Sequence, residues 1–282
     1  MKKIAALDIG GTNTRVALID ENYNIEKIVI RPTVVGNVDL FLDNVVKTIE
    51  EAIPDCNEIE AFACGVPGRV RYDGFIYALP NVHIDNVPLT SLSKKLHKPF
   101  YVLNDAEVAA LSEANVGPYK DSKSLYFVTI STGVGGAFTR NGKLVPTSYE
   151  VGHTMTKYRG EIHEFEHLAS GTGIIRLCDM NGLNVGSAKD FFNLVRSKYP
   201  LAMTVYNDWL DLLADFFKMI YDTFTPEIFT LTGGVMKSSD LFFDDLKKRL
   251  PGMRLEICGT GQNAGLLGSA VYGFQKVKEN QK

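Results

Sequence analysis

Apolar and polar positions along the chain predict two regions that begin in the same way. Residues 3–9 (KIAALDI) form a short apolar run, a turn of Gly, Gly, Thr and Asn follows, and residues 14–20 alternate as a second strand. Residues 125–130 form another apolar run, residues 131–136 (STGVGG) form a glycine-rich turn, and residues 137–140 continue as a strand. This weak internal repeat predicts two related structural halves.

Further strands and helices are predicted along both halves. In the first half, the apolar spacing predicts an extended stretch at 25–31, a helix at 39–53, strands at 59–64 and 100–103, and helices at 89–96 and 106–115, with a loop region around Pro80 and Asn81. In the second half it predicts helices within 173–224, a strand at 227–231, a helix at 238–250, a strand at 254–258 and a closing helix at 263–277. Strands followed by crossover helices predict an α/β protein with mixed sheets.

Length and pattern together predict two lobes. A chain of 282 residues is long enough for one large domain or two modest ones. We expect residues 1–115 to form the first lobe, 116–262 to form a helix-rich second lobe, and 263–282 to return to the first lobe. A cleft between such lobes is expected to close on a substrate and exclude water.

Composition and charge exclude several classes of protein. The apolar content of 45% is that of a globular chain, and 30 Lys and Arg residues against 33 Asp and Glu residues give a net charge of −3. No broad basic field is therefore available to bind nucleic acid or anionic lipid. No run of about 18 apolar residues occurs, so we expect no membrane span. Asp8 limits the apolar stretch after the basic start to four residues, so we expect no export.

The cysteines indicate the compartment. Cys56, Cys64, Cys178 and Cys258 are scattered without a CxxC pair, and a chain of this size needs no disulfide to fold. We interpret them as buried thiols in a reducing compartment and expect a cytoplasmic protein.

The first glycine turn carries a candidate phosphate site. Asp8 ends an apolar strand, and Gly10, Gly11 and Thr12 follow it closely. Adjacent glycines let backbone N–H groups converge on an anion, the threonine hydroxyl adds a donor, and the aspartate can hold Mg²⁺ directly or through water. The alternative is an ordinary glycine turn beside a surface acid, but the second turn at 131–136 favours the phosphate site. Neither a GxGxxG fingerprint nor a P-loop is present.

Asn104 and Asp105 form a candidate catalytic pair between the two turns. They follow a predicted strand and precede a predicted helix. A helix N-terminus favours negative charge and would keep Asp105 ionised, as a base that accepts a hydroxyl proton during phosphoryl transfer requires. The alternative is a helix cap, for which both residue types are common.

These motifs together resemble those of the ROK family of sugar kinases and sugar-responsive repressors, and the resemblance covers nearly the whole chain. The matching segments are DIGGT at 8–12, GVPG at 65–68, NDAEVAALSE at 104–113, STGVGGAFTRNGKL at 131–144, EVGH at 150–153 and LTGGV at 231–235. One departure is Glu107, where the family usually has Asn. The resemblance implies a two-lobed, actin-like (ribonuclease H-like) α/β fold with mixed sheets and flanking helices.

The resemblance also implies a set of site residues, with Asp105 as the catalytic base. The implied ATP-binding and phosphate-binding residues are Asp8, Gly10, Gly11, Thr12, Thr132, Gly133, Gly233 and Gly234. The implied sugar-binding residues are Gly65, Asn81, Asn104, Asp105, Glu150, His153 and Glu166. Several polar partners of this kind suit a polyol. The alternative for His153 is a structural loop histidine.

Most relatives carry three cysteines that bind structural zinc together with the histidine of the ExGH motif, and this chain departs from that pattern. Alignment on the last glutamate of the motif, Glu166, places Lys157, Arg159 and Glu164 at the cysteine positions. Lysine and arginine cannot replace thiolates, so we predict that zinc is absent. We expect packing or ion pairs to hold the loop instead, for example Arg159 with Glu161 or Glu164.

Residues 163–167 (HEFEH) match HExxH, the helix motif of zinc metalloproteases. Such an enzyme needs a third ligand and a helix long enough to present both histidines, whereas Gly160 and the pair at 170–171 confine this segment. A peptidase is therefore an alternative that the sequence disfavours.

The resemblance implies an ATP- and Mg²⁺-dependent kinase for the 6-hydroxyl of a hexose or N-acetylhexosamine. Ser131 and the segment GHT at 152–154 resemble N-acetylmannosamine kinases of sialic acid breakdown, whereas residues 67–68 (PG) resemble glucokinases, so we expect N-acetylmannosamine first and glucose second. One alternative is a repressor, but only seven residues precede Asp8. Another is a catalytically silent sugar-binding protein. We expect a homodimer, a state common in the family.

Overall fold

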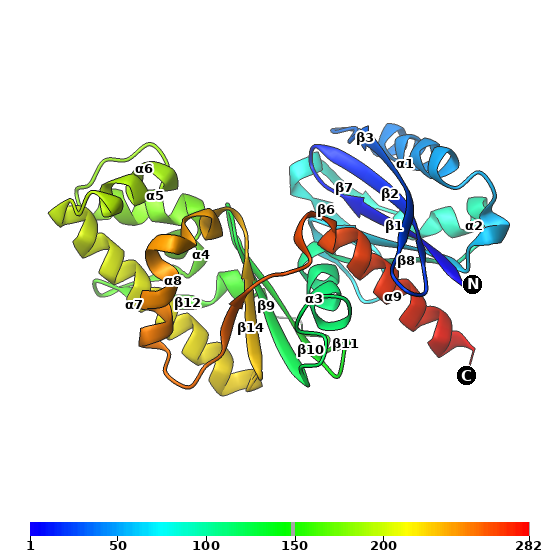
Figure 1. The fold of residues 1–282 in the computed structure, drawn as a ribbon. Coiled ribbons are helices and arrows are strands. Elements are labelled where there is room, and N and C mark those ends of the chain that lie inside the picture. The colour runs from blue at the N-terminus through cyan, green and yellow to red at the C-terminus, as the bar shows by residue number, and fades with distance from the viewer. Residues whose placement is uncertain (148–149, 282) are drawn as a thin grey trace. The chain divides into compact units, whose positions relative to one another are not determined.

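The computed structural model describes residues 1–147 and 150–281 and shows two compact units (Figure 1). Unit 1 comprises Met1–Asp121 and Gly259–Lys282, and unit 2 comprises Ser122–Cys258. The predicted boundaries, after residues 115 and 262, lie six and four residues from the observed ones. Each unit has its own sheet and its own core.

The central sheet of unit 1 has the strand order β3-β2-β1-β4-β8. Its strands are β1 (Lys3–Ile9), β2 (Asn13–Asp20), β3 (Ile25–Pro32), β4 (Ala61–Val66) and β8 (Phe100–Asn104). β1 and β2 form the predicted N-terminal hairpin, and β3 pairs antiparallel with β2. β4 runs parallel to both β1 and β8, so the carboxyl ends of these three strands lie at one edge of the sheet.

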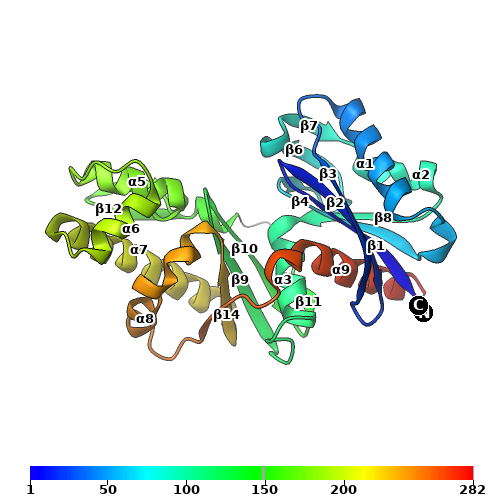
Figure 2. The same cartoon turned by 45° about the horizontal axis from the view of Figure 1, so that its top comes forward.

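Helices cover both faces of this sheet, as Figures 1 and 2 show. The helices of unit 1 are α1 (Val38–Ala52), α2 (Leu92–Leu96), α3 (Asp105–Asn115) and α9 (Ala264–Asn280), with the short 3₁₀ helices η1 (Cys56–Glu58), η2 (Pro80–Val82), η3 (Leu89–Ser91) and η6 (Gly261–Asn263). Alternate residues of β1 enter different cores: Leu7 belongs to the cluster that includes Phe41 of α1, and Ala6 to the cluster that includes Leu266 of α9. Burial on both faces explains the uninterrupted apolar run near the start of the sequence.

A small second sheet of unit 1 occupies the region where the sequence predicted a loop. It consists of β5 (Arg69–Val70), β6 (Ile76–Leu79) and β7 (Ile84–Val87). Pro80 and Asn81 lie in η2, between β6 and β7. The loop prediction is therefore wrong for much of this region, because strands of two to four residues are too short to show a clear alternating pattern.

Unit 2 repeats the strand arrangement of unit 1, with the order β11-β10-β9-β14-β15. Its strands are β9 (Ser124–Ile130), β10 (Val134–Arg140), β11 (Lys143–Leu144), β14 (Ile228–Thr232) and β15 (Leu255–Ile257). β9 and β10 form an antiparallel hairpin, and β14 pairs in parallel with both β9 and β15. The predicted repeat of strand, glycine turn and strand is confirmed.

Helices form most of the remainder of unit 2. They are α4 (Glu166–Ala169), α5 (Gly171–Met180), α6 (Ala188–Arg196), α7 (Pro200–Phe224) and α8 (Ser239–Arg249), with the 3₁₀ helices η4 (Val151–His153) and η5 (Gly234–Ser238). Their apolar faces share one core with the sheet, in which Trp209 is fully buried and donates its indole N–H to the carbonyl of Ala169 at 3.1 Å. A hairpin of β12 (Met155–Tyr158) and β13 (Glu161–Glu164) precedes α4. The sequence did not predict this hairpin.

The cysteines are less uniformly buried than expected. Cys64 and Cys178 are buried, whereas Cys56 and Cys258 are partly exposed, and all four are free thiols. The prediction of buried thiols is therefore wrong for Cys56, which begins η1, and for Cys258, which follows the end of β15. Packing is less complete at such element ends. No helix within the described ranges is long and apolar enough to cross a membrane.

Candidate active site

The carboxyl ends of three parallel strands bring several predicted residues of unit 1 to one sheet edge. Asp8 of β1 pairs in register with Gly65 of β4, and Val66 of β4 pairs with Asn104 of β8. Neighbouring strands lie about 4.8 Å apart, so β1 and β8 are separated by roughly 10 Å. Asp8, the glycine turn after β1 and the pair Asn104–Asp105 therefore share this edge.

Asp8 is held in a polar network at the start of α9. Arg15 contacts the Asp8 carboxylate at 3.3 Å and donates to the carbonyl of Gln262 and to the side chain of Asn263, both at 2.7 Å. A Cβ on Gly265 would lie 2.6 Å from the Asp8 carboxyl carbon, so only glycine lets α9 approach this group. Burial raises the pKa of Asp8, and the charge of Arg15 partly offsets that effect.

This environment fits a divalent cation. Asp8 is partly buried, and its carboxylate contacts Arg15 instead of lying free on the surface. A cation at this carboxylate would favour its ionised form. Asp8 therefore differs from the surface acid of the alternative interpretation. Its carboxylate oxygens are ligands of the kind that Mg²⁺ binds.

The turn from Gly10 to Thr12 is fixed through its carbonyl groups. Thr33 donates its hydroxyl to the carbonyl of Gly10 at 2.7 Å and its backbone N–H to the carbonyl of Thr12 at 2.9 Å. A Cβ on Gly11 would lie 2.7 Å from the carbonyl oxygen of Asn81. The fold therefore places Asn81, a predicted sugar-binding residue, directly against the predicted phosphate turn.

Asn104 is the N-cap of α3, and Asp105 is the first helical residue. The Asn104 side chain accepts from the N–H of Ala106 at 2.9 Å, while Glu107 accepts from the N–H of Asn104 at 3.1 Å, which completes a capping box. The Asn104 amide also donates to the carbonyl of Gly68 at 2.9 Å. The cap interpretation thus holds for Asn104, whereas Asp105 is exposed at the helix N-terminus.

The structure explains why glutamate occurs at position 107 and glycine at position 65. The glutamate that departs from the family pattern is the reciprocal half of the capping box. Gly65 is buried, and a Cβ there would lie 2.6 Å from a methyl carbon of Val108 in α3. This close strand–helix contact by itself requires glycine, and contact of Gly65 with a sugar stays a prediction.

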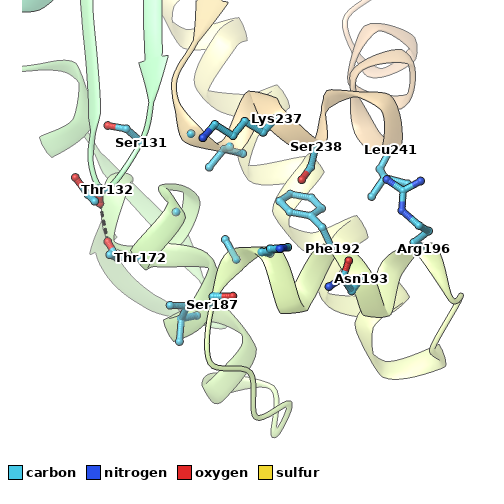
Figure 3. Close-up of a pocket in the computed structure, with 16 residues that line it drawn as sticks. Ser131, Thr132, Thr172, Ser187, Phe192, Asn193, Arg196, Lys237, Ser238 and Leu241 are labelled. Carbon is cyan, nitrogen blue, oxygen red and sulfur yellow. Dashed lines mark hydrogen bonds between the residues drawn. The ribbon is translucent and has the colours of Figure 1, made fainter.

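In unit 2, the two predicted nucleotide turns lie against each other. The hydroxyl of Thr172 donates to the carbonyl of Thr132 at 2.6 Å, the dashed line in Figure 3, and the N–H of Gly171 donates to the carbonyl of Ser131 at 2.6 Å. Gly233 has φ of +106°, and a Cβ there would lie 2.2 Å from the carbonyl oxygen of Ile130. Glycine is needed at position 233 both for the backbone conformation and for this close approach.

A pocket of about 780 Å³ adjoins these turns within unit 2 (Figure 3). Its lining combines hydroxyl, apolar and cationic side chains from the turn after β9, α5, α6, η5 and α8: Ser131, Thr132, Thr172, Ile175, Ser187, Lys189, Phe192, Asn193, Arg196, Lys237, Ser238 and Leu241. In Figure 3 the ring of Phe192 points into the pocket, and the Lys237 side chain extends toward Ser131. The volume and the mixed lining suit a small organic ligand with an anionic end.

Sequence reasoning found only part of this pocket. Thr132 and Gly234 were predicted, but the residues on α5, α6 and α8 were not. The apolar members of this set continue the amphipathic pattern of their helices, so a core position gives the same signal as a pocket position. Only the arrangement of the three helices distinguishes them.

His153 and Glu166 lie together beside the second glycine turn. Glu166 accepts from the N–H of Val134 at 3.0 Å, and its other carboxylate oxygen lies 4.0 Å from Nδ1 of His153. A Cβ on Gly133 would lie 2.7 Å from the Glu166 carboxylate, and a Cβ on Gly152 would lie 2.3 Å from the carbonyl oxygen of Val134, a backbone contact that requires glycine at position 152. Two predicted sugar-binding residues thus adjoin the predicted phosphate turn of the same unit.

Glu164 contacts two histidines, His153 and His167. Its carboxylate lies 2.9 Å from Nδ1 of His153 and 3.3 Å from Nε2 of His167. The hydrogen bond to Glu164 raises the pKa of His153, and the same bond lowers the pKa of Glu164. Glu150, the remaining predicted sugar ligand of this unit, is exposed.

Arg159 does not make the expected ion pair with Glu161 or Glu164. It donates to the carbonyl of Met180 at 3.0 Å and to the side chain of Asn181, and its guanidinium lies over the ring of Tyr158. That expectation is wrong because Arg159, with φ of +50°, sits in the turn between β12 and β13 and reaches the end of α5.

The residues at the cysteine positions differ from the thiolate ligands that the resemblance implies for structural zinc. Lys157 is exposed, Arg159 is bound to the end of α5, and neither side chain can supply a thiolate. His153, Glu164 and Glu166 bring one nitrogen and two oxygen donors within 4.8 Å of one another, which is an incomplete set for a tetrahedral structural site. The absence of zinc stays a prediction.

The HExxH match also lacks the required geometry. His163 and Glu164 belong to β13, whereas Glu166 and His167 belong to α4, a helix of four residues. The two histidines therefore do not lie one turn apart on one helix, as the metalloprotease motif requires. A peptidase site is not formed by these residues.

Each unit thus carries polar groups and a glycine turn at the carboxyl edge of its sheet, the usual position of ligands in open α/β sheets. The repeated hairpin and parallel strands define an α/β protein with the actin-like fold. The model of the ROK family matches residues 4–272, and the chain belongs to that family.

Known proteins resemble all or part of the chain. The glucokinase of Thermotoga maritima is 27% identical over 278 residues, which cover 88% of this chain and 87% of that protein. An N-acetylmannosamine kinase of Vibrio cholerae is 32% identical over 142 residues, 49% of this chain and 48% of that protein. The crystal structure of a ROK hexokinase from Thermus thermophilus matches with a TM-score of 0.85 over 98% of this chain and 99% of that one, at 24% identity, which confirms the fold.

Proposed function

We propose that the protein is an ATP-dependent kinase that phosphorylates the 6-hydroxyl of a hexose or N-acetylhexosamine. The observation that carries this proposal is the sheet edge of unit 1, where Asp105 stands at a helix N-terminus and Asn81 lies against the Gly10–Thr12 turn. In this proposal, one scaffold supplies a base, polar groups for a sugar and a turn for phosphate. Membership of the ROK family supports the same activity.

The nucleotide is proposed to bind mainly through unit 2. The pocket beside Thr132 and Gly234 has apolar surface for a base, and Lys237 extends toward the glycine turn that would hold phosphate. Asp8 is proposed to hold Mg²⁺, which neutralises charge on the phosphates when bound. Backbone N–H groups of both glycine turns would contact the remaining phosphate oxygens.

The proposed chemistry is an in-line phosphoryl transfer. The Asp105 carboxylate accepts the proton of the 6-hydroxyl as the hydroxyl oxygen bonds to the γ-phosphorus. The bond between that phosphorus and the β,γ-bridging oxygen breaks, and ADP leaves. The helix N-terminus at Asp105 favours the ionised carboxylate that this step requires.

The proposed sugar ligands are polar groups from both units. Asn81, Asn104 and Asp105 are supplied by unit 1, and Glu150, His153 and Glu166 by unit 2. We propose N-acetylmannosamine as the first substrate, because Ser131 and the segment at 152–154 resemble kinases of that sugar. A relative that matches 49% of the chain carries that name. Glucose is the second candidate, supported by residues 67–68 and by the Thermotoga relative.

A panel of sugars at fixed ATP tests this proposal. ADP release should depend on an added hexose or N-acetylhexosamine, and ³¹P–¹H correlation in the product should place the phosphate on O6. A preference for N-acetylmannosamine over glucose supports the first candidate, and the reverse supports the second. Sugar binding without ADP release across the panel would instead establish the silent sugar-binding alternative.

A further inference from the structure

Glu164 occupies a position with no role in the proposed reaction, yet it is bound to a proposed sugar ligand. One carboxylate oxygen lies 2.9 Å from Nδ1 of His153 and 3.3 Å from Nε2 of His167. Glu164 is the last residue of β13, and Met155 of β12 pairs with it in register. The β12–β13 hairpin thus places this carboxylate beside the His153 ring.

The hairpin that carries Glu164 is fastened to the helical core. The Tyr158 hydroxyl donates to Asp208 of α7 at 2.6 Å and accepts from the Asn181 amide at 2.8 Å. Arg159 binds the carbonyl of Met180, and the N–H of Phe165 donates to the carbonyl of Thr154 at 2.7 Å. A carboxylate on so firmly held a hairpin can fix the orientation of its partner.

Glu166 does not provide this support. Its Oε2 atom accepts from the N–H of Val134 at 3.0 Å, and its Oε1 atom is 4.0 Å from Nδ1 of His153, beyond hydrogen-bond distance. Glu164 is thus the carboxylate within hydrogen-bond distance of the ring. The exposed side of His153 remains open to a ligand, since 44% of its side chain is accessible.

The contact determines which ring nitrogen can accept a hydrogen bond. A carboxylate accepts only, so Nδ1 of His153 must carry the proton, and Nε2 of the neutral ring is then the acceptor. Across residues 1–147 and 150–281, no hydrogen-bond partner occupies Nε2 of His153. A sugar hydroxyl is a donor of the kind that this nitrogen requires.

We propose that Glu164 is a positioning residue, which holds His153 in the Nδ1–H tautomer with Nε2 directed to a hydroxyl of the sugar. This inference rests on the proposed function, because it assumes that His153 contacts the sugar. It adds a residue that sets sugar affinity without touching the sugar or the phosphates.

The test compares Glu164→Ala with Glu164→Gln and with Glu161→Ala. Glu161 lies on the same strand with a side chain 75% accessible, which makes it a matched control. Glu164→Ala should raise the KM for the sugar about tenfold, as expected for loss of a charge-assisted hydrogen bond, and leave the KM for ATP within about twofold. Glu164→Gln, whose amide oxygen still accepts from Nδ1, should stay within about threefold of the parent, as should Glu161→Ala.

Two results would overturn the proposal. One is an unchanged sugar KM in Glu164→Ala, or equal increases in the KM values for sugar and ATP, which would mark a general structural effect. The other is a loss of sugar affinity after chelation that zinc restores, which would assign the orienting role to a metal.

Nitrogen-15 shifts of the His153 ring test the tautomer without any turnover. The Nδ1–H form in the unmodified protein supports the proposal, and the Nε2–H form contradicts it, even if Glu164→Ala fails to fold. Failure of the proposed kinase is a separate result, since it would show as an absence of sugar-dependent ADP release in the unmodified protein.

Discussion

At the scale of single residues, Asp105 is the side chain on which the proposed chemistry depends. Asp105→Asn removes the proton acceptor but keeps the size of the side chain. Loss of a general base typically costs about 10²- to 10⁴-fold, so kcat should fall by that range while the KM for the sugar changes little. Steady-state kinetics with the best sugar of the panel measure both.

The control for Asp105 is Asp39→Asn. Asp39 is likewise an acid in the first turn of a helix, α1, and lies outside the proposed site. Its substitution should leave kcat within about twofold of the parent. Equal losses in the two variants, or full turnover in Asp105→Asn, would remove Asp105 from the mechanism.

Asp8 leads to a prediction about magnesium and pH. Burial raises the pKa of Asp8 above its ordinary value of 3.8, with Arg15 opposing the shift. Protonation of Asp8 therefore begins at a higher pH than usual, and the Mg²⁺ concentration for half-maximal activity should increase as the pH falls toward that pKa. Asp8→Asn should raise this concentration about 10- to 100-fold at neutral pH and remove the dependence.

Titration of Mg²⁺ at several pH values, at fixed ATP and sugar, measures this effect. Asp20→Asn is a suitable control because Asp20 ends β2 and binds Asn22 and Asn24 away from the site. A magnesium requirement unaltered by Asp8→Asn would contradict the assignment of the cation to Asp8.

At the scale of elements, the crossing of α3 and α9 depends on a single glycine. A Cβ on Gly268 would lie 1.6 Å from the carbonyl oxygen of Val108, so the helices must separate to accept any side chain. Gly268→Ala should lower the free energy of unfolding by about 1–3 kcal/mol, the usual cost of overpacking. Gly234→Ala, which meets no atom within 4 Å, should change stability much less.

Denaturant unfolding of both variants measures the difference. A loss of similar size in Gly234→Ala would show that the effect is not specific to the helix crossing. Because α3 begins with Asp105, we also expect Gly268→Ala to lower turnover.

The elements also differ in how well the sequence predicts them. The hairpin of β1 and β2 and the helix α7 were predicted because seven or more residues repeat one pattern and turn residues bound them. The small sheet β5–β6–β7 and the hairpin β12–β13 were not, since strands of two to four residues depend on pairing instead of local pattern. The hairpin β12–β13 matters most, because it delivers Glu164 to His153.

At the scale of the whole molecule, Glu113 binds the segment at residues 259–260, where the chain returns to unit 1. It is fully buried in α3 and accepts from the backbone N–H groups of Gly259 and Thr260 at 3.0 and 2.8 Å and from the Thr260 hydroxyl. Glu113→Gln places an amide N–H₂ against these donors, so the free energy of unfolding should fall by about 2–4 kcal/mol. Glu279→Gln, near the end of α9, is an exposed control.

Hydrogen exchange locates the effect of Glu113→Gln. Protection of amides in 259–280 should fall more than protection in the β1–β2 hairpin, because the substitution alters the hydrogen bonds to residues 259–260 and leaves the sheet unchanged. An unchanged unfolding midpoint together with unchanged protection of 259–280 would contradict the role given to Glu113.

Local patterns in the sequence predicted the repeated halves, the glycine turns and the positions of Asp8, Asn104 and Asp105 at the ends of strands and helices, because apolar runs, turn residues and helix caps act over a few neighbouring positions. By contrast, the contacts of Glu164 with His153, of Arg159 with Met180 and of Glu113 with a segment 146 residues away are visible only in the folded protein. Helices distant in sequence form the pocket beside Thr132 for the same reason. Such contacts depend on how whole elements pack, and packing is a property of the folded chain that no local pattern records.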